Sequence, residues 1–195
     1  SSLGAGAVSA GDFTATILTG DANSGINSGL TYTAKADFNG GAQTINGVGF
    51  TDTGTTGTNY AIGGALNAFN GPYGNSVTGA LNSTSSNFFY NGDGTGNNSM
   101  TLSGLNPGTQ YVASWYNVAF GGNRYIDITP SDTGTPFRFN EDNGISGSGS
   151  VLRYSFTANA TTQVFSFDAV SNGDSFHHYA FTNAVRNDAV FSYTH

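Results

Sequence analysis

Two adjacent histidines, in the stretch DSFHHYAF, are residues of this sequence that could bind a metal ion or transfer a proton. In an extended strand, His177 and His178 point to opposite faces and cannot bind one metal ion together. His177 is expected to share a face with Tyr179 and Phe181. A zinc site needs three or four converging ligands, and only distant carboxylates could complete one here. We therefore expect both histidines to be structural residues near the rim of the fold.

Acidic loops suggest a second kind of chemistry, the binding of a calcium ion. Asp93 lies in NGDGTGNN, and Glu141 and Asp142 lie in RFNEDNG. Calcium prefers several oxygen ligands from such loops, so these three residues are candidates for a structural Ca²⁺ site. The spacing of an EF-hand is absent, and the alternative is that the acidic residues form ordinary turns. No other cofactor is expected.

Known catalytic motifs are absent from the sequence. It contains no G-x-S-x-G elbow, no P-loop and no H-E-x-x-H. Paired carboxylates could hydrolyse a glycoside. However, Glu141 is the only glutamate, and its side chain is expected to point away from that of its loop neighbour Asp142. We therefore expect a protein without catalytic activity.

Exposed aromatic rings could bind a sugar, because the CH-rich face of a sugar ring stacks on a flat aromatic side chain. Neighbouring Asn, Asp or Arg side chains would then bind the hydroxyl groups. Trp115 lies in the middle of an expected strand, where a core position is the alternative. Tyr73, in NGPYGN, is expected in a loop. The candidate residues are Tyr73, Tyr90, Trp115 and Tyr125.

The composition limits the possible partners. Among 195 residues there are twelve acidic and five basic side chains, giving a net charge of −7, and there is no cysteine. Nucleic acids and anionic membrane surfaces are bound by clusters of Lys and Arg, which this chain lacks. The absence of cysteine excludes disulfides, thiol catalysis and a cysteine zinc site. No apolar stretch of the sequence is long enough to span a membrane.

Apolar and polar residues alternate in short segments throughout the chain, which predicts β-strands, and we expect no helix. In SVLRYSFTA, the residues Leu152, Tyr154 and Phe156 share one face. In TTQVFSFDA, Phe165 and Phe167 share one face, while serine and aspartate lie on the other. Such alternation is typical of half-buried antiparallel strands.

Turn residues separate these segments. Asn-Gly pairs begin at residues 39, 46, 70, 91, 143 and 172, and they favour tight turns. Many short strands joined by turns predict an all-β fold, an antiparallel β-sandwich or jelly roll. We expect one such domain over residues 13–195, preceded by an extended segment at 1–12. The expected strands are 13–18, 30–34, 44–50, 60–62, 76–81, 87–90, 99–105, 109–120, 124–129, 137–139, 150–158, 163–169, 176–182 and 189–193.

The two ends of the chain could mediate assembly. As a strand, the segment SSLGAGAVSAGD would place small apolar residues along one side. It either lies along its own domain or adds to an open sheet edge of a neighbouring subunit. Repeated head to tail, that contact would form a filament. The tail DAVFSYTH also has high β-propensity. The residues expected to carry assembly are Leu3, Ala5, Ala7, Val8, Val190, Phe191 and Tyr193.

Three stretches resemble secreted bacterial β-sandwich domains often found upstream of PEP-CTERM-type surface-sorting signals. They are LTYTAKADFNGGAQTINGVGF, MTLSGLNPGTQYVASWYNVAFGGNRYIDIT and FHHYAFTNAV, and the resemblance extends from Leu30 to Val185. It implies a galactose-binding-like jelly roll, export from the cell, and an exopolysaccharide or cell-surface setting. The sorting helix and basic tail are absent from this sequence.

Together these observations favour an extracellular protein without catalytic activity. The chain begins at Ser1 rather than Met, as expected after removal of a signal peptide. The main hypothesis is a structural subunit that self-assembles into a filament or matrix through its terminal strands. The alternative is a carbohydrate-binding module of a secreted or cell-surface protein. An aromatic platform on a monomer would favour the alternative, whereas assembly that depends on the termini would favour the main hypothesis.

Overall fold

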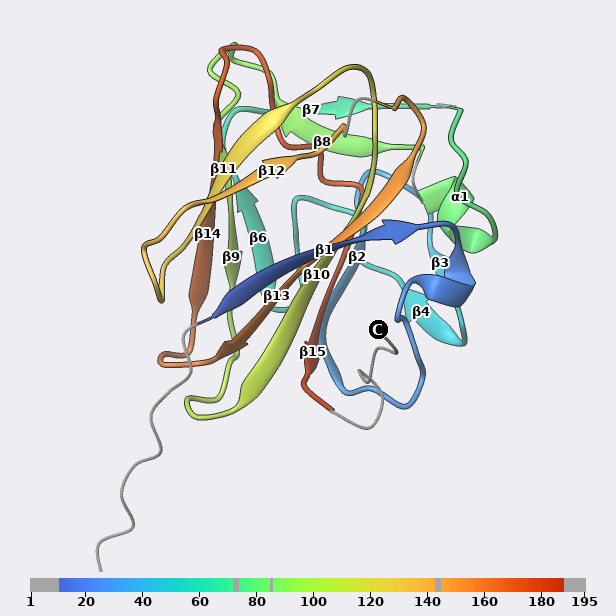
Figure 1. Cartoon of the computed structure of the whole chain (residues 1–195). Helices are drawn as coiled ribbons and strands as arrows, with labels where there is room; N and C mark the ends of the chain where they lie inside the picture. The colour runs from blue at the N-terminus through green and yellow to red at the C-terminus, as the bar shows by residue number, and fades with distance from the viewer. Residues whose placement is uncertain (1–10, 72–73, 85, 143–144, 188–195) are drawn as a thin grey trace, which may run out of the picture.

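A computed structural model describes residues 11–71, 74–84, 86–142 and 145–187 and shows two antiparallel β-sheets packed face to face (Figure 1). In that view, β14, β9 and β6 lie on the left, and β10, β15 and β2 lie on the right. The predicted all-β sandwich is therefore confirmed. Within the described ranges, every helix is too short or too polar to cross a membrane.

The two sheets contain five and six strands. The five-stranded sheet has the order β1 (Asp12–Leu18), β13 (Gly149–Thr157), β10 (Gln110–Val118), β15 (Ala180–Val185) and β2 (Tyr32–Asp37). The six-stranded sheet has the order β12 (Phe137–Asn140), β11 (Tyr125–Pro130), β14 (Gln163–Ala169), β9 (Asn98–Leu102), β6 (Tyr60–Gly63) and β5 (Thr56–Gly57).

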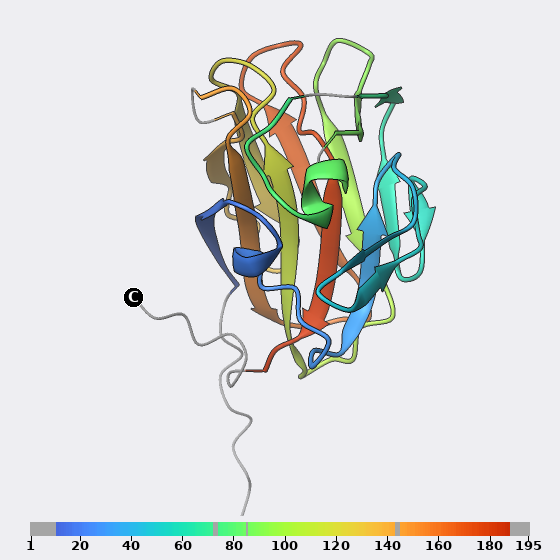
Figure 2. The same ribbon diagram turned by 90° about the vertical axis from the view of Figure 1, so that its right-hand side faces the viewer.

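Two small hairpins and two short helices complete the fold. The hairpins pair β3 (Gln43–Ile45) with β4 (Val48–Phe50) and β7 (Leu66–Phe69) with β8 (Phe88–Asn91). The helices are a 3₁₀ turn η1 (Asp21–Asn23) and α1 (Ala80–Thr84). Figure 2 shows α1 lying over the strands of the five-stranded sheet.

The space between the sheets is filled by the inward residues of alternating strands. Trp115 of β10 is 1% exposed and lies at the centre of this inter-sheet core. Its ring meets Phe165 edge to face at a centroid distance of 4.9 Å, and it lies 5.1 Å from the ring of Phe181. The predicted inward residues of β13 and β14 are part of the same core.

The outer face of the five-stranded sheet is covered by a second core. Tyr116 and Val118 of β10, Val151 of β13 and Ala180 of β15 point into it, alternating with the inter-sheet residues. Residues from the β3–β4 hairpin, α1 and β8 complete this outer core. Sequence alternation predicts half-buried strands, but β10 is buried on both faces from residue 111 onward.

Two predicted strands differ in the structure: one is divided into two short strands and the other ends in a helix. Residues 44–50 form a hairpin, because Asn46 and Gly47 have φ values of 49° and 78°, as a tight hairpin turn requires. Residues 80–84 form α1 although no helix is expected there. The carboxylate of Asp21 accepts hydrogen bonds from the N–H groups of Ala80 and Leu81, both at 2.9 Å. A residue distant in the sequence therefore caps this helix.

Candidate carbohydrate-binding face

The six-stranded sheet presents a polar outer face to solvent. Along β11, Ile126 and Ile128 point into the inter-sheet core, so the residues between and beside them point outward. The outward residues of the three central strands are all half-buried or exposed; they are Tyr125, Asp127, Thr129, Val164, Ser166, Asp168, Ser99 and Thr101.

Tyr125 is the large aromatic residue exposed on this face. It is 42% exposed and begins β11. Asn140 of β12 lies directly opposite in the register, and Val170, itself 44% exposed, donates its N–H to the Tyr125 carbonyl at 3.0 Å. An apolar ring surface is thus flanked by an amide side chain.

An ion pair occupies the next row of the sheet. Arg138 of β12 lies opposite Asp127 of β11 and donates to both of its carboxylate oxygens, at 2.8 and 2.7 Å. The hydrogen bonds and charge of Arg138 lower the pKa of Asp127. Asp168 lies on the other side of Asp127. Burial, together with the Asp127 charge, raises the pKa of Asp168.

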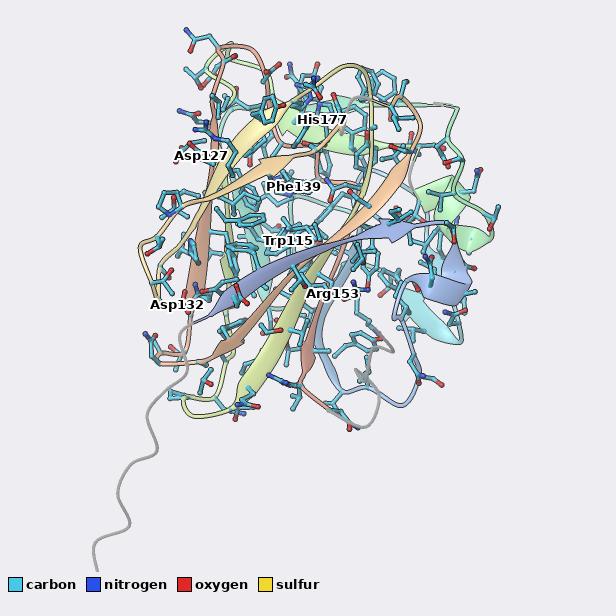
Figure 3. The ribbon with its side chains drawn as sticks, in the orientation of Figure 1. Trp115, Asp127, Asp132, Phe139, Arg153 and His177 are labelled. Carbon is cyan, nitrogen blue, oxygen red and sulfur yellow. The ribbon has the colours of Figure 1, made fainter. Side chains whose placement is uncertain are left out.

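We name the outward residues Tyr125, Asp127, Arg138 and Asn140 the Tyr125 face. Figure 3 shows Asp127 projecting from the side of the molecule that carries β11. Beyond the ion pair, Thr129, Ser166 and Ser99 place hydroxyl groups side by side across three strands. The surface therefore combines one flat ring with charged, amide and hydroxyl groups.

The other predicted aromatic candidates are not part of this face. Trp115 is buried in the inter-sheet core and is not available to a ligand. Tyr90 of β8 is half-buried and packs against the outer core, with its ring 5.9 Å from that of Phe88. Tyr73 lies outside the described residues.

The histidines are structural, and they point to opposite sides as predicted. His177 stacks on Phe88 with a centroid distance of 4.2 Å, whereas the His178 ring packs between aromatic rings of the inter-sheet core. The predicted common face of His177, Tyr179 and Phe181 is wrong for Phe181. Tyr179 and Ala180 both point into the outer core, so the alternation breaks between them and Phe181 turns inward.

Glu141 and Asp142 are buried rather than exposed on a loop, and both are 1% exposed. The Glu141 carboxyl accepts the His177 backbone N–H, with both oxygens at 3.1 Å, and lies 3.3 Å from His177 Nδ1. Asp142 instead accepts the Phe120 N–H at 2.9 Å and faces Arg124, whose Nε is 3.3 Å away. The two side chains therefore bind different partners, and each fixes a loop.

The protonation of this buried region follows from its surroundings. Burial and the neighbouring Asp142 charge raise the pKa of Glu141 well above its usual range. Burial and the Arg124 charge lower the pKa of His177 well below its usual range. Burial therefore favours the uncharged forms of both side chains. A protonated Glu141 can donate to His177 Nδ1.

The predicted calcium ligands do not form one site. The exposed Asp93 accepts the N–H and hydroxyl of Thr95, at 2.8 and 2.7 Å, which is an ordinary Asx turn. Across the described part of the chain, no three His, Asp or Glu side chains gather in a group that could hold a metal ion.

A groove separates the free edges of the two sheets on one side of the sandwich. It runs between β1 and β12 and contains cavities of about 320 and 500 Å³ that share Phe137. Ile17 of β1 lines the smaller cavity and is 73% exposed. The groove is not predictable from the sequence, because it depends on which strands lie at the edges of the two sheets.

The residues expected to carry assembly lie outside the described residues. They are Leu3, Ala5, Ala7, Val8, Val190, Phe191 and Tyr193.

Comparisons with known proteins identify similar folds only. No protein-family model and no curated protein matches the sequence. The structure is similar to a family 35 carbohydrate binding module from Clostridium thermocellum, with a TM-score of 0.40 and 10% identity over 64% of this chain and 90% of that one. It is also similar to CBM35 from Paenibacillus barcinonensis, with a TM-score of 0.40 and 14% identity over 66% and 94% of the two chains. What this chain binds must be inferred from its own side chains.

Proposed function

We propose that this protein is a carbohydrate-binding module without catalytic activity, and that it binds a polysaccharide chain across the Tyr125 face. The observation that carries the proposal is the exposed Tyr125 ring beside Asn140 and the Arg138–Asp127 pair. An apolar ring with a few fixed polar groups around it is the composition expected of a site for small polar ligands.

Each part of the face has a distinct role in the proposal. The Tyr125 ring stacks on the CH face of one sugar unit. The Asn140 side chain accepts the Arg124 N–H at 3.0 Å and donates to the Asn123 side chain at 2.8 Å, so it is held in a fixed position beside the ring. Fixed polar groups of this kind set the orientation of a bound ligand. The mutual hydrogen bonds of Asp127 and Arg138 hold both side chains in place. The remaining hydrogen-bond donors and acceptors of the pair are therefore preorganised to bind the next sugar unit of the chain.

The charge of the chain favours a neutral polysaccharide. The net charge is −7, and the Arg138 guanidinium is already paired with Asp127. A polyanionic glycan would therefore be repelled by the chain as a whole. The resemblance to exported surface proteins suggests an exopolysaccharide of the cell surface as the setting.

Tyr125→Ala is expected to weaken binding to a neutral polysaccharide about tenfold, which corresponds to the loss of about 1.4 kcal/mol of stacking. Affinity electrophoresis in gels containing candidate glucans, xylans and mannans would identify the ligand, and calorimetry with its oligomer would give the Kd. Ile145→Ala is the control, because Ile145 is an exposed apolar residue, at 64%, that is not part of the Tyr125 face. Equal binding by wild type and the Tyr125 variant would contradict the proposal.

Self-association is a second candidate function, supported by the free edge of β1. Within the described residues β1 pairs only with β13, and Ile17 leaves an apolar side chain exposed on it. A tail segment containing Phe191 from a second copy would add to this edge through main-chain hydrogen bonds.

Light scattering and negative-stain microscopy of the full chain test this second candidate. Filaments that disappear in Ile17→Lys and in a variant lacking residues 188–195 are expected, because the first places a charge on the edge strand and the second removes the segment that would pair with it. A monomer of 20.0 kDa in all three samples would exclude it.

A further inference from the structure

The larger cavity of the groove has walls made of aromatic rings. It measures about 500 Å³ and lies where β1 begins, beside the turn that joins β11 to β12. The rings of Phe13 and Phe137 stack with a centroid distance of 4.9 Å and an angle of 16°. Phe13 also contacts Tyr154, whose ring centroid is 4.5 Å away. Three rings from three strands therefore meet at one cavity.

Two carboxylates lie at the same cavity. Asp132, labelled at the lower left of Figure 3, accepts the Tyr154 hydroxyl, with both oxygens at 2.8 Å, and Gln163 Nε2 at 2.9 Å. Asp12, at the start of β1, lines this cavity and also a neighbouring one of about 250 Å³ that Arg186 lines. Burial and the charges of Asp132 and Asp12 raise the pKa of Tyr154, so both carboxylates lie close enough to act on this hydroxyl.

The negative charge of this cavity is not balanced by its lining. Neither Lys, Arg nor His is among the described residues that line it. A carboxylate can accept about four hydrogen bonds, and Asp132 keeps part of that capacity after binding Tyr154 and Gln163. Aromatic faces attract cations through their quadrupole. Charge and ring geometry thus select the same kind of ligand, an organic cation.

We propose that this cavity binds the ammonium group of an amino sugar unit, with Asp12 and Asp132 as the anionic partners and Phe13 and Phe137 as the ring walls. The choice of a sugar rather than another amine rests on the proposed function of the Tyr125 face. It is also supported by Thr133 and Thr135, which line the same cavity with hydroxyl groups.

A metal ion does not fit this cavity. Divalent cations with oxygen ligands need several carboxylate, carbonyl or water oxygens arranged around them. The described residues here supply two carboxylates and aromatic rings. They include no group of three His, Asp or Glu side chains that could hold a metal ion. An ammonium group needs only two or three hydrogen-bond acceptors, and it is also attracted to the faces of the aromatic rings.

Two oligosaccharides with charged and uncharged nitrogen groups test the proposal. The full chain is titrated by calorimetry with a glucosamine tetramer and with its fully N-acetylated counterpart, at about pH 5, where the amines are protonated and exposed carboxylates are ionised. We expect the glucosamine tetramer to bind at least about tenfold more tightly, and its affinity to fall as salt is added.

Single-charge variants then locate the site. Asp132→Asn keeps an acceptor for Tyr154, and Asp12→Asn changes an exposed side chain, so each retains the fold while removing one charge. Each is expected to weaken glucosamine binding at least about fivefold. Asp93→Asn is the matched control, because it removes an exposed carboxylate in a loop that does not line the cavity, and its affinity should stay within about twofold of wild type.

Equal affinity for the two tetramers, or a loss of affinity in Asp93→Asn as large as in the cavity variants, would overturn the proposal. Its failure is distinguishable from failure of the proposed function. Neutral polysaccharide binding is tested through Tyr125→Ala, and neither cavity variant is expected to change it.

Discussion

Replacing Trp115 by alanine is expected to lower the free energy of unfolding by about 3–5 kcal/mol. The ring is 1% exposed and contacts the rings of Phe165, Phe167 and Phe181, which come from both sheets. Alanine would leave a cavity at the point where the two sheets meet. Urea denaturation followed by circular dichroism measures the effect, since Trp115 is the only tryptophan and its fluorescence is lost with it.

Trp115→Phe separates lost packing from loss of the indole. The indole Nε1 has no hydrogen-bond partner among the described residues, so phenylalanine removes an unpaired buried donor while keeping a ring. We expect a loss of about 1–2 kcal/mol for this variant. If Trp115→Ala cost less than about 1 kcal/mol, the ring would not be in the core as described.

Asp37→Asn is expected to stabilise the protein by up to about 4 kcal/mol above pH 7, with little effect near pH 4. Asp37 at the end of β2 is fully buried, and neither carboxylate oxygen has a hydrogen-bond partner among the described residues. Burial raises its pKa from 3.8 to about 7. The ionised form is therefore disfavoured in the folded protein.

The direction of the pH dependence follows from this shift. Between about pH 4 and pH 7, Asp37 is ionised in the unfolded chain and still protonated in the folded one, so stability falls as the pH rises through this range. Asparagine carries no charge at any pH, so the variant lacks this contribution to the pH dependence of stability. Urea denaturation of both proteins at about pH 4 and pH 8 measures the difference.

Other buried groups cancel in that comparison. His178 has its pKa lowered to about 3 by burial, so it lowers stability in acid, and Glu141 lowers stability as pH rises. Both groups are present in both proteins, and only Asp37 changes. A stability difference that is the same at the two pH values would show that Asp37 does not titrate as proposed.

Local alternation predicts most strands of this fold, because its period is set by the pleat of the strand itself. The inward residues of β13 and β14 follow from the letters SVLRYSFTA and TTQVFSFDA, and both sets lie in the inter-sheet core. The same pattern cannot show that the opposite face of β13 is also covered. Arg153 on that face donates to the Ser24 carbonyl at 2.7 Å, and Val151 belongs to the outer core together with residues of α1 and the β3–β4 hairpin. Helix α1 is in turn capped by Asp21, from another part of the chain.

The binding face was predictable only in part. Tyr125 is a candidate from its residue type, and the structure leaves its ring exposed. Asp127, Arg138 and Asn140 were not predicted as site residues, although alternation along YIDIT and FRFN places the first two away from the apolar residues. Their pairing depends on the register between β11 and β12, which no local pattern fixes. Residue type alone likewise could not show that Glu141 and Asp142 are buried.

Strand β10 is hydrogen-bonded on one edge to β13 and on the other to β15, and both of its faces are covered. Its backbone amides can therefore exchange with deuterium only when the whole domain unfolds, whereas those of the edge strand β1 can exchange through local fraying. Isotope labelling of Tyr111–Val118 would thus report the global opening of the protein, and labelling of β1 would report the breathing of the groove beside it.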